Sequence, residues 1–378
     1  MTALIKAVFA GGGTAGHINP ALAIAGYLKE KQPDSQILFV GNKNSMEEKL
    51  VKRAGFEFET IDICGFKRSL SPKACVQNAA TAFKAAAAVS ASKKIIRRFN
   101  PDVCIGTGGY VSGPVVRAAA SLGVKTLIHE QNAFPGVTTK MLSKKADVVM
   151  LAIADAAKRL DSDCNTILTG NPIRGEVLKA QPTVARRTLG LDERPVVLSF
   201  GGSLGARAVN EAVAPIVARS GKDGRYQHIH AYGQYGGWFP ETVKKLGTDI
   251  DKCSNLDIRE FINNMDVCLA AADIVICRAG AITLSELQAT GTPSILIPSP
   301  NVAENHQYYN ALALADAGAA LLIEEKDLSA DKLACVLDSA LTDREKLERM
   351  AENAKRMAIT DSRERIYSQI LEQVNSKR

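Results

Sequence analysis

Short runs of apolar residues recur along the first 170 residues, separated by longer amphipathic or alanine-rich stretches. The apolar runs are rich in β-branched residues, which favour strands, whereas the stretches between them have helical length and pattern. The expected strands are residues 5–10, 37–40, 103–105, 126–129 and 148–151. Because strands that alternate with helices form parallel sheets covered by those helices, this region is predicted to be an α/β domain.

The same pattern starts again after Asn171-Pro172 and a polar stretch at Gln181-Pro182. Its expected strands are residues 196–200, 228–232, 274–277 and 294–297. Each half opens on an apolar strand, a glycine-rich loop and a helix, and the two openings lie about 190 residues apart. The repeat predicts two Rossmann-like α/β domains.

The chain has 378 residues, 46% of them hydrophobic, which is enough to build two cores. We expect an N-terminal domain at residues 1–170 and a C-terminal domain at residues 171–360. From Ala330 onward the pattern is helical only. The last helix, at about residues 362–375, is expected to pack back on the N-terminal domain. Residues 361–378 are therefore treated as a segment separate from the C-terminal domain.

No apolar run is long enough to cross a membrane, and the alanine-rich run at residues 79–91 is interrupted by Lys84. The N-terminus lacks the apolar region and cleavage site of a secretory signal. The eight cysteines include no Cys-x-x-Cys pair, so we expect buried thiols in a reducing compartment instead of zinc ligands or disulfides.

The net charge of +7 is concentrated in the N-terminal half. Residues 1–170 carry 22 Lys/Arg against 13 Asp/Glu, whereas the remainder carries 25 against 27. No acidic residue occurs between Asp62 and Asp102, where eight Lys/Arg are interleaved with apolar residues. An anionic membrane surface is the expected partner of this stretch, and no nucleic acid is expected. A solvated helix face beside an ordinary core stripe is the alternative.

The residues expected to enter or contact the membrane are Phe66, Lys67, Arg68, Lys73, Phe83 and Lys84.

Gly11-x-Gly13-x-x-Gly16 follows the first strand and matches the dinucleotide fingerprint. The acidic residue that would bind a dinucleotide ribose is absent, because Gly41-Asn42-Lys43 follows the second strand. The loop is therefore interpreted as a phosphate site, built from close backbone approach and the free N–H groups of a helix N-terminus. Asn19-Pro20 is expected to begin that helix, and His17 to face the same ligand.

A second glycine loop, at residues 106–114, follows another strand of the same domain. Two such loops at the carboxyl ends of strands favour a pyrophosphate over a single phosphate. Glycines that serve only tight turns remain the alternative for either loop.

Two further patterns suggest other chemistry. Gly201-x-Ser203-x-Gly205 between a strand and a helix matches the nucleophile elbow of α/β-hydrolases, and Asp273 and His306 follow in the required order. A hydrolase, however, leaves the two N-terminal loops without a role. Asp161-Ser162-Asp163 could hold a metal and a nucleotide, but its polar surroundings favour a solvated turn.

Six segments together resemble a known family over nearly the whole chain. They are residues 11–20, 106–114, 129–133, 170–174, 201–206 and 277–286. The resemblance is to the MurG family of glycosyltransferase family 28, which transfers N-acetylglucosamine from UDP to undecaprenyl-pyrophosphoryl-MurNAc-pentapeptide during peptidoglycan synthesis. It implies the GT-B fold, in which two Rossmann-like domains face a cleft, with the acceptor lipid in the N-terminal domain and UDP-GlcNAc mainly in the C-terminal one.

The resemblance also implies roles for individual residues. Arg174 and Ser203 would contact the UDP phosphates, Ile262 would offer its backbone to uracil, and Glu286 would accept hydrogen bonds from the ribose. Asn132 and Gln307 would bond hydroxyls of the sugar, although His306 stands where some members have a second glutamine. Core packing for Ile262 and a surface helix position for Glu286 are the alternatives.

The remaining donor contacts implied by the resemblance are Thr14, Ala15, Gly16, Ala281, Ile282, Thr283, Leu284 and Ser285. The acceptor pyrophosphate would lie on Gly13, Gly108, Gly109 and Tyr110.

The expected reaction is a single displacement with inversion, in which the 4-hydroxyl of the acceptor sugar attacks as UDP leaves. His17 is the proposed base, because an imidazole with its ordinary pKa of about 6.5 is mostly neutral at pH 7. Binding of the acceptor phosphate by His17 is the alternative. UDP leaves as a stable anion, so neither a catalytic metal nor another cofactor is expected.

The enzyme is expected at the cytoplasmic face of the cell membrane as a peripheral protein, and a cell-wall synthesis complex is a candidate partner. A glycolipid synthase or UDP-sugar epimerase of the same fold, a hydrolase using Ser203 and a non-catalytic nucleotide-binding scaffold are the alternative functions.

Overall fold

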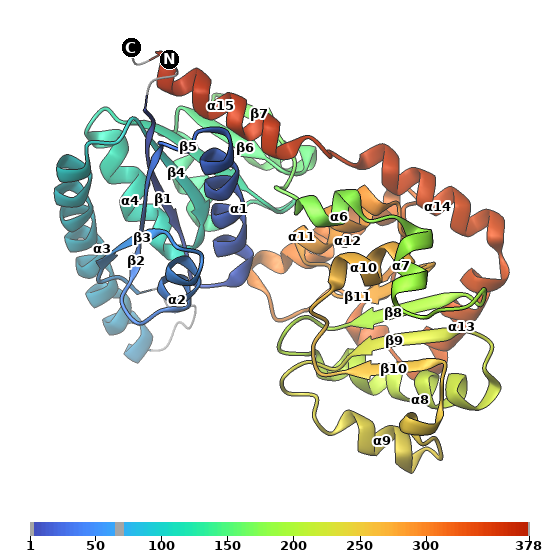
Figure 1. The fold of residues 1–378 in the computed structure, drawn as a ribbon. Helices are drawn as coiled ribbons and strands as arrows, with labels where there is room; N and C mark the ends of the chain where they lie inside the picture. The colour runs from blue at the N-terminus through green and yellow to red at the C-terminus, as the bar shows by residue number, and fades with distance from the viewer. Residues whose placement is uncertain (1–3, 65–71, 377–378) are drawn as a thin grey trace. The chain divides into compact units, whose positions relative to one another are not determined.

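The computed structural model describes residues 4–64 and 72–376, with the backbone alone for residues 72–83. The chain divides into two compact units (Figure 1). Unit 1 comprises Met1–Pro172 and Asp361–Arg378, and unit 2 comprises Ile173–Thr360. Both units are α/β, and each has its own sheet.

Among the described residues of unit 1, seven parallel strands form one sheet in the order β3-β2-β1-β4-β5-β6-β7. In chain order they are β1 (Lys6–Gly11), β2 (Gln36–Asn42), β3 (Glu57–Ile61), β4 (Val103–Gly108), β5 (Lys125–Glu130), β6 (Val148–Leu151) and β7 (Thr166–Leu168). The helices are α1 (Ala15–Lys31), α2 (Met46–Arg53), α3 (Pro72–Phe99), α4 (Gly109–Ser121), α5 (Val137–Leu142), the 3₁₀ helix η1 (Ala154–Arg159) and α15 (Ser362–Ser376). The strand order reverses direction between β1 and β4, where doubly wound sheets bind their ligands.

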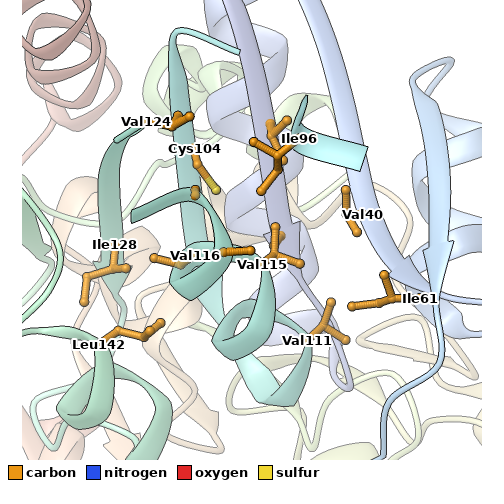
Figure 2. Packing of buried hydrophobic residues seen from close by; sticks show 14 of the residues in the cluster. Val40, Ile61, Ile96, Cys104, Val111, Val115, Val116, Val124, Ile128 and Leu142 are labelled. Atoms are coloured by element: carbon orange, nitrogen blue, oxygen red, sulfur yellow. The ribbon is translucent and has the colours of Figure 1, made fainter. Parts of the chain in front are cut away.

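Strand β1 shows why the central strands are apolar throughout. Val8 and Ala10 belong to a core cluster on one face of the sheet, and Ala7 and Phe9 to a cluster on the other. All four side chains are fully buried. Figure 2 shows the first of these clusters, in which valines of α4 pack beside Cys104 of β4. A strand covered on both faces needs a continuous apolar run.

The C-terminal helix α15 packs against α1 in unit 1 (Figure 1). Ile366, Ile370 and Val374 join the same core cluster as Phe9. Tyr27 of α1 donates a hydrogen bond to Glu364 over 2.7 Å. The last helix is therefore part of the unit that contains the N-terminus.

Unit 2 is described in full and has six parallel strands in the order β10-β9-β8-β11-β12-β13. In chain order they are β8 (Val196–Phe200), β9 (Gln227–Ala231), β10 (Leu256–Arg259), β11 (Ile274–Cys277), β12 (Ser294–Leu296) and β13 (Ala320–Leu322). Its α-helices are α6 (Gly175–Lys179), α7 (Pro182–Thr188), α8 (Arg207–Asp223), α9 (Phe239–Lys245), α10 (Met265–Ala271), α11 (Ala281–Thr290), α12 (His306–Asp316), α13 (Ala330–Thr342) and α14 (Arg344–Met357). Three 3₁₀ helices complete it: η2 (Ile250–Lys252), η3 (Ala303–Asn305) and η4 (Glu325–Asp327). The order repeats that of unit 1, with β8 and β11 in the places of β1 and β4.

All nine strands predicted from the sequence are present, to within a few residues at their ends. The prediction missed β3, β7, β10 and β13, which are the strands at the edges of the two sheets. Most of their side chains are only partly buried or exposed. An edge strand lies partly in solvent, so its sequence lacks the apolar run that marks a central strand.

Two further expectations were wrong. Helix α1 begins at Ala15, so Pro20 lies inside the helix and Asn19 is not its N-cap. The helix starts as soon as the glycine loop ends, and Pro20, the sixth residue of the helix, has no N–H to donate to the carbonyl of Gly16. Cys64 and Cys335 are exposed, whereas Cys104, Cys268 and Cys277 are buried as predicted.

Candidate functional site

The two glycine loops of unit 1 touch each other at the carboxyl ends of β1 and β4. The Gly12 N–H donates to the Gly108 carbonyl over 3.4 Å. A Cβ added to Gly109 would lie 2.0 Å from the Gly12 oxygen, and Gly108 and Gly109 have φ angles of +105° and +77°. Glycine is therefore required at both positions, which lets the two loops form one continuous backbone surface.

His17 lies in the first turn of α1 and is held from three sides. A Cβ on Gly108 would meet its Nδ1 at 2.6 Å, so the ring packs directly on the second glycine loop. Thr107 donates its hydroxyl to the His17 carbonyl over 2.7 Å, and His17 Nδ1 lies 3.3 Å from Gln131 Oε1. The sequence predicted His17 beside the loop but gave no role to Gln131.

The residues predicted for the acceptor pyrophosphate are brought together. The ring of Tyr110 lies against Gly13, where an added Cβ would meet it at 2.9 Å. Asn42 donates its amide to the Tyr110 hydroxyl over 3.3 Å. Gly13, Gly108 and Gly109 adjoin Tyr110 along the two loops. They form a surface beside the start of α1, although the N–H groups of Gly13 and Gly108 already donate to Glu47 and Ser112.

A buried carboxylate beneath the first loop was not predicted. Glu47, 1% exposed, accepts hydrogen bonds from the Gly13 N–H at 3.4 Å and the Asn42 N–H at 3.3 Å. It uses the N–H of Gly13 itself, and in the first turn of α1 the N–H groups of His17 and Ile18 donate to the Thr14 carbonyl. That turn includes Ala15 and Gly16, which are exposed.

The loop after β5 carries Asn132 and is held by Glu130. This carboxylate is 3% exposed and accepts from the backbone N–H and the side-chain amide of Asn132, both at 3.1 Å. It also accepts from the Gly136 N–H at 3.0 Å and from the Thr139 hydroxyl. Asn132 is thus placed in one orientation at the carboxyl edge of the sheet.

Unit 2 contains a pocket of about 570 Å³ at the carboxyl ends of its strands. Residues from the starts of three helices line it: Arg207 of α8, Thr283 of α11 and Gln307 of α12. Ser203, in the glycine loop after β8, lies in the same lining. Three helix N-termini at one pocket provide partial positive charge and free N–H groups, which suits a diphosphate.

Arg278 and Glu325, which the sequence analysis did not single out, also line this pocket. Arg278 donates to the carbonyls of Ile297 and Pro298 over 3.1 and 3.2 Å and forms an ion pair with Glu325. The Ser299 N–H donates to Gln307 Oε1 over 2.9 Å. Because the oxygen of Gln307 is already bonded, its Nε2 amide is the group that can donate to a ligand.

Glu286 lies on α11 and is buried, which excludes the surface position weighed for it. Arg174, at the start of α6, donates to it from Nε over 3.0 Å and from Nη2 over 2.9 Å. Burial raises the pKa of Glu286, and the charge and hydrogen bonds of Arg174 act in the opposite direction. Neither residue is part of the pocket lining.

The other predicted donor residues have different environments. Ile262 and Leu284 are buried in the core of unit 2. Ser285 donates its hydroxyl to the Ala281 carbonyl over 3.2 Å, and Ile282 is half-buried beside it on α11. Thr14, Ala15 and Gly16 are exposed at the start of α1.

The predicted membrane residues lie mostly outside the described part of the chain. Phe66, Lys67 and Arg68 are not described, nor are the side chains of Lys73 and Phe83. Lys84 forms an ion pair with Asp62 over 3.1 Å, and both side chains are largely exposed. Within the described residues, no helix is long and apolar enough to cross a membrane.

A hydrolase triad is not formed. Asp273 precedes β11 and accepts from the Val196 N–H over 2.7 Å, so it lies at the amino ends of the strands. Ser203 follows the carboxyl end of β8, at the opposite edge of the sheet. His306 is bonded through Nδ1 to the Ala303 carbonyl over 2.7 Å.

Asp161 forms an ion pair with Lys144, and the Asp161-Ser162-Asp163 segment is an exposed turn. Among the described side chains, no group of three or more His, Cys, Asp or Glu residues is placed to hold a metal ion.

Comparison with known proteins shows to which family the chain belongs. Residues 7–151 match the glycosyltransferase family 28 N-terminal domain, and residues 196–366 match the glycosyltransferase family 28 C-terminal domain. The chain belongs to glycosyltransferase family 28. The two Rossmann-like units of this family 28 glycosyltransferase are those of the GT-B fold.

Relatives of this family 28 enzyme match it along its whole length. One is the UDP-N-acetylglucosamine--N-acetylmuramyl-(pentapeptide) pyrophosphoryl-undecaprenol N-acetylglucosamine transferase of Acetivibrio thermocellus, 46% identical over 376 residues and covering 99% of each chain. The protein of the same name from Thermoanaerobacter sp. (strain X514) is 44% identical, over 97% of this chain and 99% of its own. The crystal structure of Acinetobacter baumannii MurG superposes with a TM-score of 0.78 at 29% identity, covering 97% and 99% of the two chains.

Proposed function

We propose that this glycosyltransferase moves N-acetylglucosamine from UDP-GlcNAc to the 4-hydroxyl of undecaprenyl-pyrophosphoryl-MurNAc-pentapeptide. The observation that carries the proposal is the 46% identity, over 99% of both chains, with an Acetivibrio thermocellus enzyme named for this transfer. The geometry supports it, because each unit has its own ligand surface at the carboxyl ends of its strands.

Unit 2 binds the donor. The pocket lined by the starts of α8, α11 and α12 receives the diphosphate of UDP. Gln307 Nε2 donates to a hydroxyl of the sugar. Glu286 accepts hydrogen bonds from the ribose, since Arg174 occupies only one of its two carboxylate oxygens.

Unit 1 binds the acceptor. The paired glycine loops and the first turn of α1 receive the pyrophosphate of the lipid, and His17 stands beside them. His17 takes the proton of the attacking 4-hydroxyl. The new bond forms at the anomeric carbon as the bond to the UDP oxygen breaks, and the configuration at that carbon inverts.

The reaction proceeds without a catalytic metal. UDP carries its charge stably at neutral pH, so the leaving group needs electrostatic stabilisation rather than protonation. Each helix N-terminus at the donor pocket can supply about 0.3 to 2 kcal/mol. Transfer should therefore be unchanged by EDTA, whereas a metal-dependent enzyme would lose activity and recover it with added Mg²⁺ or Mn²⁺.

The enzyme acts as a peripheral protein on the cytoplasmic leaflet. The acid-free stretch between Asp62 and Asp102 supports this placement, because its cations can meet anionic lipid while the acceptor stays anchored in the bilayer. Because both the acceptor and the product are anchored in the membrane by a lipid, the enzyme acts close to the other cell-wall enzymes that use these lipids.

Incubation with radiolabelled UDP-GlcNAc and a short-chain analogue of the lipid-linked acceptor tests the proposal. We expect label in a lipid product that contains both sugars, and no product when the acceptor lacks its 4-hydroxyl. Conversion of UDP-GlcNAc to another UDP-sugar without any acceptor would instead identify an epimerase. Transfer to a diacylglycerol but not to the pyrophosphoryl lipid would identify a glycolipid synthase.

A further inference from the structure

A chain of hydrogen bonds runs from His17 into the buried interior of unit 1. His17 Nδ1 lies 3.3 Å from Gln131 Oε1, and Gln131 Nε2 lies 3.0 Å from Nδ1 of His129. His129 Nε2 in turn lies 3.0 Å from the Gly170 carbonyl oxygen. Gln131 and His129 are 3% and 1% exposed, so these bonds are shielded from water.

The orientation of the Gln131 amide is determined by its neighbours. Its Nε2 lies 3.0 Å from the carbonyl oxygen of Thr107 and 2.9 Å from that of His129. Carbonyl oxygens only accept hydrogen bonds, so the amide nitrogen must face them. The amide oxygen must then face His17, and it can only accept. The proton of that hydrogen bond therefore belongs to His17 Nδ1.

The position of the proton on His129, at the other end of this hydrogen-bonded network, is determined in the same way. The Gly170 carbonyl only accepts, so the proton of His129 is on Nε2. Burial lowers the pKa of His129, which keeps its ring neutral with this single proton. Its Nδ1 then carries a lone pair and faces the Gln131 amide nitrogen, whose two hydrogens are shared among this ring nitrogen and the carbonyls of Thr107 and His129. The two end links therefore have a determined direction: His17 donates to Gln131, and His129 donates to Gly170.

We propose that Gln131, supported by His129, holds His17 in the tautomer with the proton on Nδ1 and the lone pair on Nε2. Gln131 is a positioning residue, since it acts through the His17 ring. Among the described residues Nε2 of His17 has no hydrogen-bond partner, so its lone pair is open to a ligand hydroxyl. The catalytic consequence rests on the proposed function, but the tautomer itself does not.

The tautomer decides which proton transfer is possible. With the lone pair on Nε2, the attacking hydroxyl gives its proton to Nε2 as its oxygen bonds to the anomeric carbon and the electron pair of the broken bond leaves with UDP. The resulting imidazolium keeps its Nδ1 proton on Gln131 Oε1. With the opposite tautomer, Nε2 would carry a proton and could not accept another.

NMR of the full-length protein with isotope-labelled histidine measures the tautomer directly, because protonated and bare ring nitrogens give separate nitrogen resonances. The chain has five histidines, and the His17 signals are assigned by their loss in His17→Asn. At a pH one to two units above the ordinary imidazole pKa of about 6.5, we expect the proton on Nδ1 of His17 and on Nε2 of His129. A proton on Nε2 of His17 in the wild-type protein would overturn the proposal.

Two substitutions at Gln131 separate positioning from folding. Gln131→Met keeps the size of the side chain but removes both amide groups, so His17 should relax to a mixture of tautomers. Turnover should then fall about 10- to 100-fold, with the KM for UDP-GlcNAc nearly unchanged. Gln131→Glu retains an oxygen facing Nδ1, and its second oxygen, when protonated, can donate to the carbonyl of Thr107 or His129 in place of the amide, so this variant should retain the wild-type tautomer.

Thr126→Val is the matched control for stability. Thr126 is a buried polar residue of β5, the strand that ends just before Gln131, and its hydroxyl donates to Asp147 and does not contact His17. This variant should lose stability and keep both the tautomer and the turnover. A tautomer ratio in Gln131→Met equal to that of the wild type would also overturn the proposal.

The two proposals fail separately. If the wild-type protein shows the predicted tautomer but transfers no sugar, the proposed function fails and the tautomer assignment stands. If it transfers sugar with His17 in the opposite tautomer, the function stands and the role of Gln131 does not.

Discussion

Arg174 donates two hydrogen bonds to a single carboxylate oxygen of Glu286, from Nε over 3.0 Å and from Nη2 over 2.9 Å. Because both bonds fall on Oε1, Oε2 keeps its capacity to accept from a ligand hydroxyl. The ion pair fixes the carboxylate in one orientation while it is 5% exposed. A buried, oriented carboxylate with one open oxygen is suited to recognising the hydroxyls of a ribose.

Glu286→Ala should raise the KM for UDP-GlcNAc about 10- to 150-fold. Hydrogen bonds to a charged partner contribute about 1.5 to 3 kcal/mol, and the ribose is bound in both the ground state and the transition state. Initial rates at varied donor concentration measure the effect. Thr290→Val, on the same helix, is the control and should leave the constant unchanged. An unchanged KM in Glu286→Ala would remove Glu286 from the donor site.

The affinity for the donor should fall at mildly acidic pH. Burial raises the pKa of Glu286 above its ordinary value of 4.5, and only the ionised carboxylate accepts two hydrogen bonds from the ribose. Binding is therefore complete above the raised pKa and is lost as pH falls through it. Calorimetric titration with UDP at several pH values measures this loss.

Arg174 opposes the rise in pKa, so Arg174→Met should move the loss of binding to higher pH. Glu286→Gln should bind UDP more weakly but without this pH dependence. A pH dependence that is the same in Glu286→Gln and in the wild type would assign it to another group.

His17→Ala should lower turnover about 10² to 10⁴-fold while UDP binding stays nearly intact, as expected for loss of a general base. Stopped assays of sugar transfer, together with calorimetric titration of UDP, measure the two effects separately. Asn19→Ala is the matched control, since Asn19 is exposed on the same helix. Wild-type turnover in His17→Ala would end the proposal that this residue is the base.

The stability of unit 2 should decrease at acidic pH because of two buried histidines. His228 and His230 flank the hydroxyl of Ser199, each with a ring nitrogen 2.7 Å from it. Burial lowers the pKa of His228 to about 3 and that of His230 well below its usual range. In the unfolded chain both histidines bind protons below about pH 6.5, whereas in the folded protein they stay neutral. Acid therefore favours the unfolded state.

The expected loss of unfolding free energy is about 1.4 kcal/mol per pH unit for each histidine once the pH is below about 6.5, and for His228 it ends near pH 3. His230→Phe removes one of the two titrating groups and should therefore reduce the slope by about 1.4 kcal/mol per pH unit. The variant should still fold, because a phenylalanine can keep the ring stacking on Phe239. Urea unfolding at several pH values gives both slopes. Equal slopes in variant and wild type would show that His230 is protonated in the folded protein.

Removal of four cations from the basic stretch should weaken binding to anionic vesicles at low salt. The substitutions are Lys67→Gln, Arg68→Gln, Lys73→Gln and Lys84→Gln. Each cation near such a surface contributes about 1 kcal/mol, so sedimentation with the vesicles should fall while transfer to a soluble short-chain acceptor stays almost unchanged. Lys84 should contribute least, because it is paired with Asp62.

The matched control removes four cations from α14 in unit 2: Arg344→Gln, Lys346→Gln, Arg349→Gln and Arg356→Gln. Net charge falls equally in both variants, so a general effect of charge would weaken vesicle binding in both. Equal binding by the wild type and the first variant would place the membrane contact elsewhere.

The central strands of both sheets could be predicted because burial on both faces demands a continuous apolar run, as in β1 and β8. The glycine loops were found for a related reason. Their glycines stand directly after such strands, and the positive φ angles of Gly108 and Gly109 exclude other residues. The sequence by itself therefore determined the two-unit α/β fold and the position of the glycine loops at the carboxyl edges of the sheets.

The individual contacts were decided by the tertiary structure. Gln131 lies 114 residues from His17, and Glu286 lies 112 residues from Arg174. Nothing in the local pattern marks Gln131 or Glu47, because a buried polar side chain is specified by its partners and not by its neighbours in the chain. The order of strands brings those partners together. A hydrophobic pattern records which faces are buried, whereas the direction of a hydrogen bond depends on the donors and acceptors that folding places opposite one another.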